Sequence, residues 1–263
     1  MTHTTRLTRA FRYIRLLLHI LSGLAQAAIY PHLGQATQRR MAKNWSAGLL
    51  AVLNVKMRLS GTPPDAGMRQ VMLAANHVSW LDVYALNSIC PARFVAKSEI
   101  RGWPVFGWLS RNAGTLFIER AKRSDTARIN QSISAVLTQG DRVTVFPEGT
   151  TSNGSMLRHF HASLLQPAVV AEAMLCPVAI CYRNMDGNIS KEAAYVEISL
   201  LESLRQILLQ PWITVELTFT DPINSSGKNR RELARLAEQA IASVLSLPVP
   251  HKLSEKLSGP AAE

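Results

Sequence analysis

The segment Asn76-His77-Val78-Ser79-Trp80-Leu81-Asp82 has a histidine and a carboxylate at a spacing that suits proton transfer. It follows the apolar stretch 71–75, so His77 is expected at the carboxyl end of a strand, where reactive side chains are exposed. From one turn into the next helix, Asp82 could orient one imidazole nitrogen and leave the other as a general base. In the alternative interpretation, Ser79 and Asp82 form a capping box that only closes the helix start.

Two further polar clusters follow apolar stretches. In Phe146–Ser152, Pro147 and Gly149 shape the backbone, while polar side chains such as Glu148 and Thr150 could hydrogen-bond to a polyol or a phosphate. The alternative is an ordinary exit from a strand into a loop. The segment 114–120 ends in Arg120, whose guanidinium would suit a phosphate at the end of a strand. A solvated charged strand end is the alternative there.

Taken together and in this order, the motifs resemble the glycerolipid acyltransferases of the 1-acylglycerol-3-phosphate acyltransferase type. The resemblance covers about residues 65–220. Four motifs of that family are matched, by Asn76, His77 and Asp82; by Gly114, Phe117, Ile118 and Arg120; by Phe146–Thr150 and Ser152; and by Cys176–Ile180.

The resemblance implies acyl transfer from acyl-CoA or acyl carrier protein to the hydroxyl of a lysolipid, most simply 1-acylglycerol 3-phosphate giving phosphatidate. His77 would be the general base, oriented by Asp82, and the acceptor oxygen would attack the thioester directly. The expected substrate-binding residues are Asn76, Ser79, Arg120, Glu148, Gly149 and Thr150. The thioester would be a co-substrate, and neither a cofactor nor a metal site is expected.

Other acceptors and other functions remain open. A lyso-ornithine lipid or glycerol 3-phosphate could be acylated by the same catalytic motif. From a different class, the chain could be a non-catalytic, basic protein that binds membranes. We expect no nucleic-acid partner, because the basic residues lie beside a continuous apolar face and no nucleic-acid-binding module is visible.

The charge is concentrated at the N-terminus. The 263 residues include 29 Lys and Arg against 18 Asp and Glu, for a net charge of +11. Residues 1–60 hold nine basic residues and no acid, which indicates attraction to an anionic surface such as a membrane. A hydrophobic content of 47% excludes a disordered chain. Three scattered cysteines exclude a disulfide scaffold and favour a reducing, cytosol-facing location.

The N-terminal segment has the pattern of two helices. Residues 9–28 place an apolar face opposite a basic face with Arg9, Arg12 and Arg15, which is typical of a helix lying in a membrane interface. The uncharged run 16–30 is shorter than the roughly 20 residues needed to span a bilayer. Pro31 ends this helix, and a second is expected over 35–53. These helices predict a peripheral or monotopic membrane protein that binds membrane lipids on the cytoplasmic face of the inner membrane. A signal peptide, or helices that only pack on the main domain, are the alternatives.

After Gly61, short apolar runs alternate with helical stretches, which predicts an α/β fold with a mixed, largely parallel sheet flanked by helices. We expect membrane-interface helices over 1–54, an acyltransferase domain over 55–247 and a tail over 248–263. Expected strands are Val55–Leu59, Val71–Ala75, Arg93–Ala96, Thr115–Glu119, Arg142–Phe146, Pro177–Cys181, Ala194–Ile198 and Thr214–Thr220. Expected helices are Trp80–Ile89, Val105–Asn112, Asp125–Thr138, His159–Ala173 and Arg230–Leu245.

Overall fold

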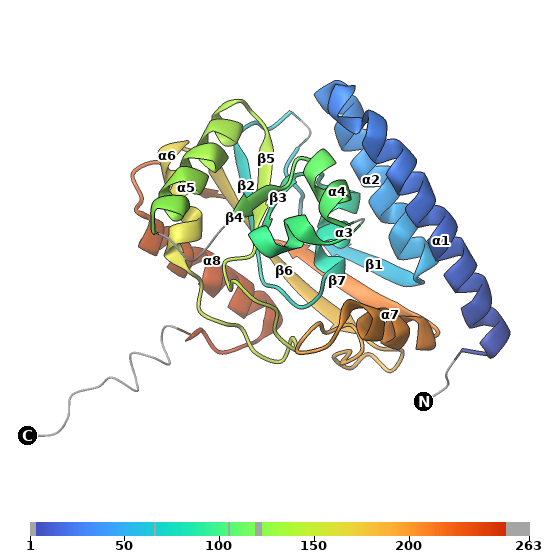
Figure 1. The fold of residues 1–263 in the computed structure, drawn as a ribbon. Helices are drawn as coiled ribbons and strands as arrows, with labels where there is room; N and C mark the ends of the chain where they lie inside the picture. Colours follow the sequence, from blue (N-terminus) through green and yellow to red (C-terminus); the bar gives the residue numbers. More distant parts are fainter. Residues whose placement is uncertain (1–3, 66, 105, 119–122, 251–263) are drawn as a thin grey trace, which may run out of the picture.

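A central sheet with helices on both faces organises the molecule (Figure 1). The computed structural model describes residues 4–65, 67–104, 106–118 and 123–250. The strands are β1 (Val55–Ser60), β2 (Val71–Ala75), β3 (Arg93–Lys97), β4 (Leu116–Ile118), β5 (Arg142–Val145), β6 (Met174–Arg183), β7 (Ile213–Phe219) and β8 (Ile223–Asn224). The α-helices are α1 (Arg6–Ile29), α2 (Gln35–Val52), α3 (Leu81–Ile89), α4 (Phe106–Asn112), α5 (Arg123–Thr138), α6 (Gln166–Val170), α7 (Leu200–Leu209) and α8 (Arg230–Leu245).

The eight strands form one mixed sheet in the order β1-β7-β6-β2-β5-β3-β4, with β8 paired to β6. Strands β1 and β7, β2 and β6, β2 and β5, β3 and β5, and β3 and β4 are parallel, whereas β6 is antiparallel to β7 and β8. The predicted fold class, a mixed and largely parallel sheet flanked by helices, is confirmed. Because β2 lies at the centre, the residues that follow it reach the middle of the sheet's carboxyl edge.

Both faces of the sheet are buried, and β2 shows why. Its alternate residues Val71, Leu73 and Ala75 join a core that includes α2, α3 and α7 residues, while Met72 and Ala74 join a second core under α5, α6 and α8. All five residues of β2 have no exposed surface. Since successive side chains point to opposite faces, a strand buried on both sides reads as a continuous apolar run.

Two expected elements are absent from the described residues. Ala194–Ile198 forms an irregular loop with a bend rather than a strand. The helix expected over His159–Ala173 is replaced by a loop, a short 3₁₀ turn over Ala162–Leu165 and the five-residue α6. There the backbone N–H of Phe160 donates to Glu238 instead of forming a helical bond, while the Phe160 ring is fully buried. Tertiary contacts override local helix propensity in this segment.

Helix α7, Leu200–Leu209, was not predicted. It begins with a capping motif in which the Ser199 side chain accepts a hydrogen bond from the Glu202 N–H. Ser199-x-x-Glu202 is the sequence pattern of a capping box, so a start signal for this helix was present. The expected C-terminal tail begins at residue 248, and the structure describes it only as far as residue 250.

The two N-terminal helices differ in how they pack. The last turns of α2 are part of the main core, because Leu49, Leu50 and Leu53 are at most 4% exposed and pack with residues of β2 and α3. Helix α1 contributes Leu16 to the same core. Packing of α2 on the domain, one of the sequence-based alternatives, is therefore what the structure contains.

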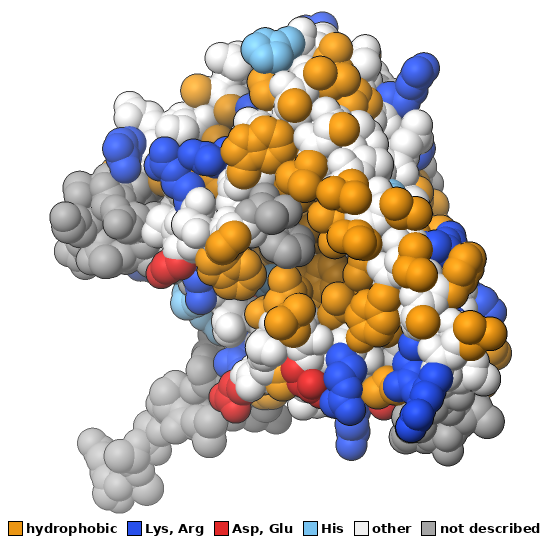
Figure 2. Space-filling view, turned by 45° about the vertical axis from the view of Figure 1, so that its right-hand side comes forward, with side chains coloured by type: hydrophobic (Ala, Val, Ile, Leu, Met, Phe, Trp, Pro, Cys, Tyr) orange, Lys and Arg blue, Asp and Glu red, His pale blue; other side chains and the backbone are white. Residues whose placement is uncertain are grey.

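Helix α1 turns its apolar face outward. Eight large hydrophobic side chains on it are at least 45% exposed: Leu7, Phe11, Tyr13, Ile14, Leu17, Leu18, Leu21 and Ile29. Figure 2 shows hydrophobic side chains gathered along this side of the molecule. The expected basic face instead points partly inward. Arg12 is buried and donates to the carbonyl oxygens of Leu208, Gln210 and Pro211, at the C-terminal end of α7, where a cation is favoured.

Helix α1 is also longer than the uncharged run that the sequence analysis considered. With the turn that follows it, the segment Arg6–His32 has the length and composition to cross a membrane. Only 17% of its most apolar 18-residue stretch is buried within the protein. The helix therefore presents a long apolar surface that nothing in the described structure covers.

The contrast between α1 and α2 can be tested by stability. We expect Leu53→Ala to lower the free energy of unfolding by about 2–5 kcal/mol, because it leaves a cavity in a closed core. Leu18→Ala, at a position that is 61% exposed, should change it by less than about 0.5 kcal/mol. Denaturant unfolding of both variants in uncharged detergent measures the difference. Equal losses would contradict the packing of α2 described above.

Candidate active site

His77 and Asp82 lie together at the carboxyl edge of the sheet. Strand β2 ends at Ala75 and α3 begins at Leu81, so the connection carries His77 past the strand end. His77 Nδ1 lies 2.8 Å from Asp82 Oδ2. The His77 side chain is 20% exposed and that of Asp82 is completely buried. The ring therefore has one nitrogen held by the carboxylate while part of it faces solvent.

The Asp82 carboxylate accepts hydrogen bonds at both oxygens. Oδ2 accepts from the His77 ring and from the backbone N–H groups of Val78, at 2.8 Å, and Ser79, at 3.0 Å. Oδ1 accepts from the Tyr182 hydroxyl at 2.7 Å. Asp82 thus accepts hydrogen bonds from the backbone at the start of α3 and holds the imidazole at once, so its role is not limited to closing the helix start.

Tyr182 is a site residue that the sequence analysis missed. It lies near the end of β6, is only 1% exposed, and its hydroxyl reaches Asp82 from the strand beside β2. Burial, together with the adjacent Asp82, raises the pKa of Tyr182 well above its ordinary value, so the hydroxyl keeps its proton and donates. A tyrosine in an otherwise apolar strand needs a partner for its hydroxyl, which was the available signal.

Glu148 points inward and holds the backbone of His77. Its Oε1 accepts from the His77 N–H at 2.8 Å and its Oε2 from the Arg158 N–H at 3.1 Å. Burial raises the pKa of Glu148 to about 7, although both N–H donors favour the charged form. The side chain is 3% exposed, so it connects the loop after β5 to the connection after β2.

Two more of the expected binding residues are inside the fold. The Asn76 side chain pairs with the backbone of Ile180: its Oδ1 accepts from the N–H at 2.7 Å and its Nδ2 donates to the carbonyl at 2.9 Å. Ser79 is fully buried, and its hydroxyl oxygen accepts from the Leu81 N–H at 3.3 Å. Asn76 joins the end of β2 to β6, and Ser79 helps to start α3.

The remaining expected residues differ in accessibility. Thr150 is exposed and Gly149 is half-buried, with a φ of +73° that favours glycine. The Gly149 N–H donates to the carbonyl of Phe146, whose ring stacks on His77 at 4.0 Å between centroids. Arg120, the expected phosphate ligand, lies outside the described residues.

The arrangement suits removal of a proton by His77. The second ring nitrogen, Nε2, forms no hydrogen bond with any residue in the described ranges, and the ring is accessible. The buried carboxylate on the other side stabilises the imidazolium that proton transfer would create. Phe146 restricts the rotation of the ring by stacking on it.

Comparisons with known proteins point to an acyltransferase. The acyltransferase family model matches residues 59–181, which contain His77, Asp82 and Glu148. The chain is 41% identical over 210 residues to the lyso-ornithine lipid O-acyltransferase of Pseudomonas aeruginosa, covering 79% of each chain. It is 35% identical over 200 residues to the 1-acyl-sn-glycerol-3-phosphate acyltransferase of Neisseria meningitidis, covering 76% of this chain and 78% of that one.

A solved structure shows the same fold. The crystal structure of the 1-acyl-sn-glycerophosphate acyltransferase PlsC from Thermotoga maritima is similar with a TM-score of 0.63 and 21% sequence identity, over 96% of this chain and all of the other. This likeness shows the fold, and the sequence relatives and the family model show the family. The chain belongs to the acyltransferase family that includes the 1-acyl-sn-glycerol-3-phosphate and lyso-ornithine lipid acyltransferases.

Proposed function

We propose that this enzyme transfers a fatty acyl group from a thioester to the hydroxyl of a lysolipid, with His77 as the general base. The observation that carries the proposal is the 2.8 Å contact between His77 Nδ1 and a completely buried Asp82. That contact leaves the other ring nitrogen to meet a substrate. The names of the sequence relatives supply the class of substrate.

In the proposed reaction, His77 Nε2 takes the proton of the acceptor hydroxyl while its oxygen attacks the thioester carbonyl. A C–O bond forms, and collapse of the tetrahedral intermediate breaks the C–S bond. The imidazolium then returns the proton to the leaving thiolate sulfur. Asp82 stabilises the imidazolium throughout and keeps its charge. The chain needs no covalent acyl-enzyme for this sequence of steps.

The other site residues divide into two roles in this proposal. Four buried side chains whose polar groups hydrogen-bond within the protein act as positioning residues for His77 and Asp82: Asn76, Ser79, Glu148 and Tyr182. Gly149 and Thr150 lie where an acceptor can reach them and would contact its glycerol portion. Arg120 would bind the acceptor's anionic group, as its motif suggests.

Two acceptors are supported. A 1-acylglycerol 3-phosphate, giving phosphatidate, matches the Arg120 motif and the Neisseria meningitidis relative. A lyso-ornithine lipid matches the more identical Pseudomonas aeruginosa relative, at 41% against 35%. The donor would be acyl-CoA or acyl carrier protein. The enzyme would work at the cytoplasmic face of the inner membrane, with the exposed side of α1 in the lipid interface.

The first prediction concerns catalysis and the acceptor. His77→Ala should lower kcat about 10³-fold for every accepted lysolipid, because the general base is lost. A matched control is His159→Ala, at a side chain that is 62% exposed, which should keep wild-type activity. Labelled acyl-CoA and acyl carrier protein are each tested with lysophosphatidate, lyso-ornithine lipid and glycerol 3-phosphate.

The panel has clear opposing outcomes. Turnover of lysophosphatidate above lyso-ornithine lipid supports phosphatidate synthesis, and the reverse order supports the second acceptor. Full activity of His77→Ala, or no transfer to any lysolipid by the wild type, would contradict the proposed function.

The second prediction concerns Tyr182. Tyr182→Phe removes the hydroxyl that donates to Asp82 Oδ1 and leaves that oxygen buried without its partner, at a cost of about 1–3 kcal/mol. We expect kcat to fall about tenfold or more with KM nearly unchanged, since the lost bond supports the transition state and not substrate binding. Tyr13→Phe, on the exposed side of α1, is the control. A change in KM alone would argue against this role.

The third prediction concerns membrane association. Leu17→Glu places a charge on an α1 position that is 58% exposed and should weaken binding to anionic vesicles about tenfold or more. Val170→Glu changes a side chain on α6 that is 63% exposed and should leave binding unchanged. Flotation of both variants with vesicles measures the difference. Equal binding of Leu17→Glu and wild type would exclude α1 as the membrane contact.

A further inference from the structure

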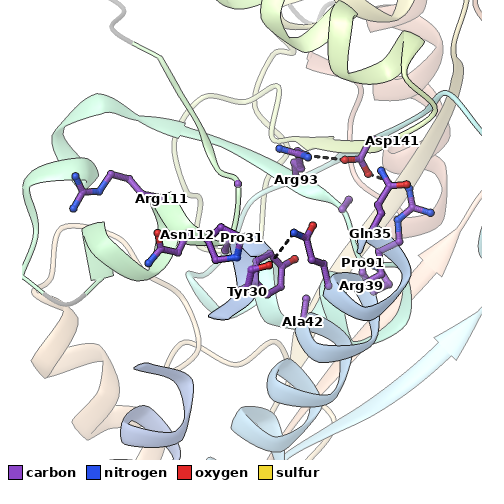
Figure 3. A pocket seen from close by; sticks show the side chains of 14 residues that line it. Tyr30, Pro31, Gln35, Arg39, Ala42, Pro91, Arg93, Arg111, Asn112 and Asp141 are labelled. Carbon is purple, nitrogen blue, oxygen red and sulfur yellow. Dashed lines mark hydrogen bonds and ion pairs between the residues drawn. The ribbon is translucent and has the colours of Figure 1, made fainter. Parts of the chain in front are cut away.

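A polar cavity lies at the edge of the sheet opposite to that of His77. Its volume is about 340 Å³, within the range of small-molecule sites. It is lined by the 3₁₀ turn Tyr30–His32 that follows α1, the first turns of α2, the start of β3 and the end of α4 (Figure 3). Arg93 begins β3 and Asp141 precedes β5, so the cavity faces the amino ends of strands whose carboxyl ends approach the active site.

Cations outnumber anions in this cavity. Arg39, Arg93 and Arg111 line it, and Asp141 is the one acid among its lining residues. Asp141 Oδ1 accepts from Arg39 at 3.0 Å and from the Arg142 N–H at 2.9 Å, and Oδ2 accepts from Arg93 Nε at 2.7 Å. Burial opposes the charge, yet the arginine hydrogen bonds hold the pKa of Asp141 below its ordinary value. The cavity therefore keeps an excess of positive charge.

Donors remain available on the arginines. Arg39 Nε is buried and has no hydrogen-bond partner within the described residues. Arg93 uses only Nε toward Asp141. Arg111 forms no hydrogen bond or ion pair with any described residue, and Figure 3 shows it on the far side from Arg39, with its guanidinium directed away from Arg39 and Arg93. Guanidinium groups with free N–H donors are suited to phosphate oxygens.

An apolar groove continues from this basic cavity. It has a volume of about 150 Å³ and shares Tyr30, Ala42, Ala92 and Ala113 with the cavity. Its other walls are mostly apolar and come from α1, α2, α3 and α4, with Ala27, Trp45, Tyr84 and Leu109 among them. The exposed side of α1 reaches the same place, because Ile29, which is 53% exposed, directly precedes Tyr30.

We propose that the basic cavity and the groove together bind an anionic phospholipid of the membrane, with its phosphate at Arg39 and Arg93 and an acyl chain in the groove. The excess of arginines in the cavity is complementary to the negative charge of the lipid phosphate. Because the groove adjoins the exposed face of α1, a lipid could enter it from the bilayer. A free phosphate would match the cavity but leave the groove without an occupant. This site is separate from His77 and does not rest on the proposed catalytic role.

The test uses the full-length protein in uncharged detergent, with binding measured by isothermal titration calorimetry. The probes are dihexanoyl phosphatidylglycerol, dihexanoyl phosphatidylcholine and inorganic phosphate. We expect the wild type to bind phosphatidylglycerol at least tenfold more tightly than the other two. Arg39→Gln should weaken that binding about tenfold, because a charged hydrogen bond is lost.

Two more variants make the test specific. Ala113→Phe adds a bulky side chain at an exposed residue shared by cavity and groove; it leaves the Asp141 ion pairs intact and should also weaken binding about tenfold. It carries the test if Arg39→Gln does not fold. Arg58→Gln, at an arginine on β1 whose side chain is 74% exposed, is the control and should bind like the wild type.

Three outcomes would overturn the proposal. The first is equal phosphatidylglycerol binding by wild type, Arg39→Gln and Ala113→Phe. The second is inorganic phosphate binding as tight as that of the lipid and insensitive to Ala113→Phe, which would assign the cavity to free phosphate. The third is an effect of Ala113→Phe only on the KM for long-chain acyl-CoA, which would assign the groove to the acyl donor.

Discussion

The buried carboxylate of Asp82 is the group on which the active site depends. A carboxylate without solvent contact is tolerated only when hydrogen-bond donors surround it, and here the donors come from the end of β2, the start of α3 and the end of β6. Each of these elements is therefore held in place relative to the others by one side chain. Asn76 strengthens the same junction, because its amide pairs with the Ile180 backbone two residues before Tyr182.

The parallel register of the sheet brings the second half of the site to this carboxylate. Strands β2 and β5 pair in parallel, so their carboxyl ends lie side by side and the loop after β5 meets the connection after β2. Phe146 then stacks on the His77 ring, and Glu148 accepts the His77 N–H. The ring is thus restrained from its face, its backbone and its Nδ1 atom. In the proposed mechanism, His77 held in this way needs little reorganisation before it takes a proton as the general base.

The sequence predicted what local pattern determines, and it failed where distant residues decide. The bounds of β2 and α8, and the pairing of His77 with Asp82, follow from apolar runs, caps and short spacing. The inward direction of Glu148 does not, because its partners His77 and Arg158 come from two different loops. The helix expected over 159–173 failed for a similar reason, since Glu238 on α8 takes a backbone N–H from that segment. Tyr182 required knowledge that β6 lies beside β2.

The N-terminal helices show the same limit in another form. A helical wheel identifies the two faces of α1, but it does not say which face the protein covers; Arg12 decides this by binding the C-terminal carbonyls of α7. The apolar face of α1 then faces outward, near the groove that Phe94 helps to line. The Phe94 ring lies 6.0 Å from that of Phe146, which stacks on His77 at 4.0 Å. A series of aromatic contacts therefore connects the groove to the His77 ring, while the inward contacts of Arg12 determine which face of α1 is left exposed.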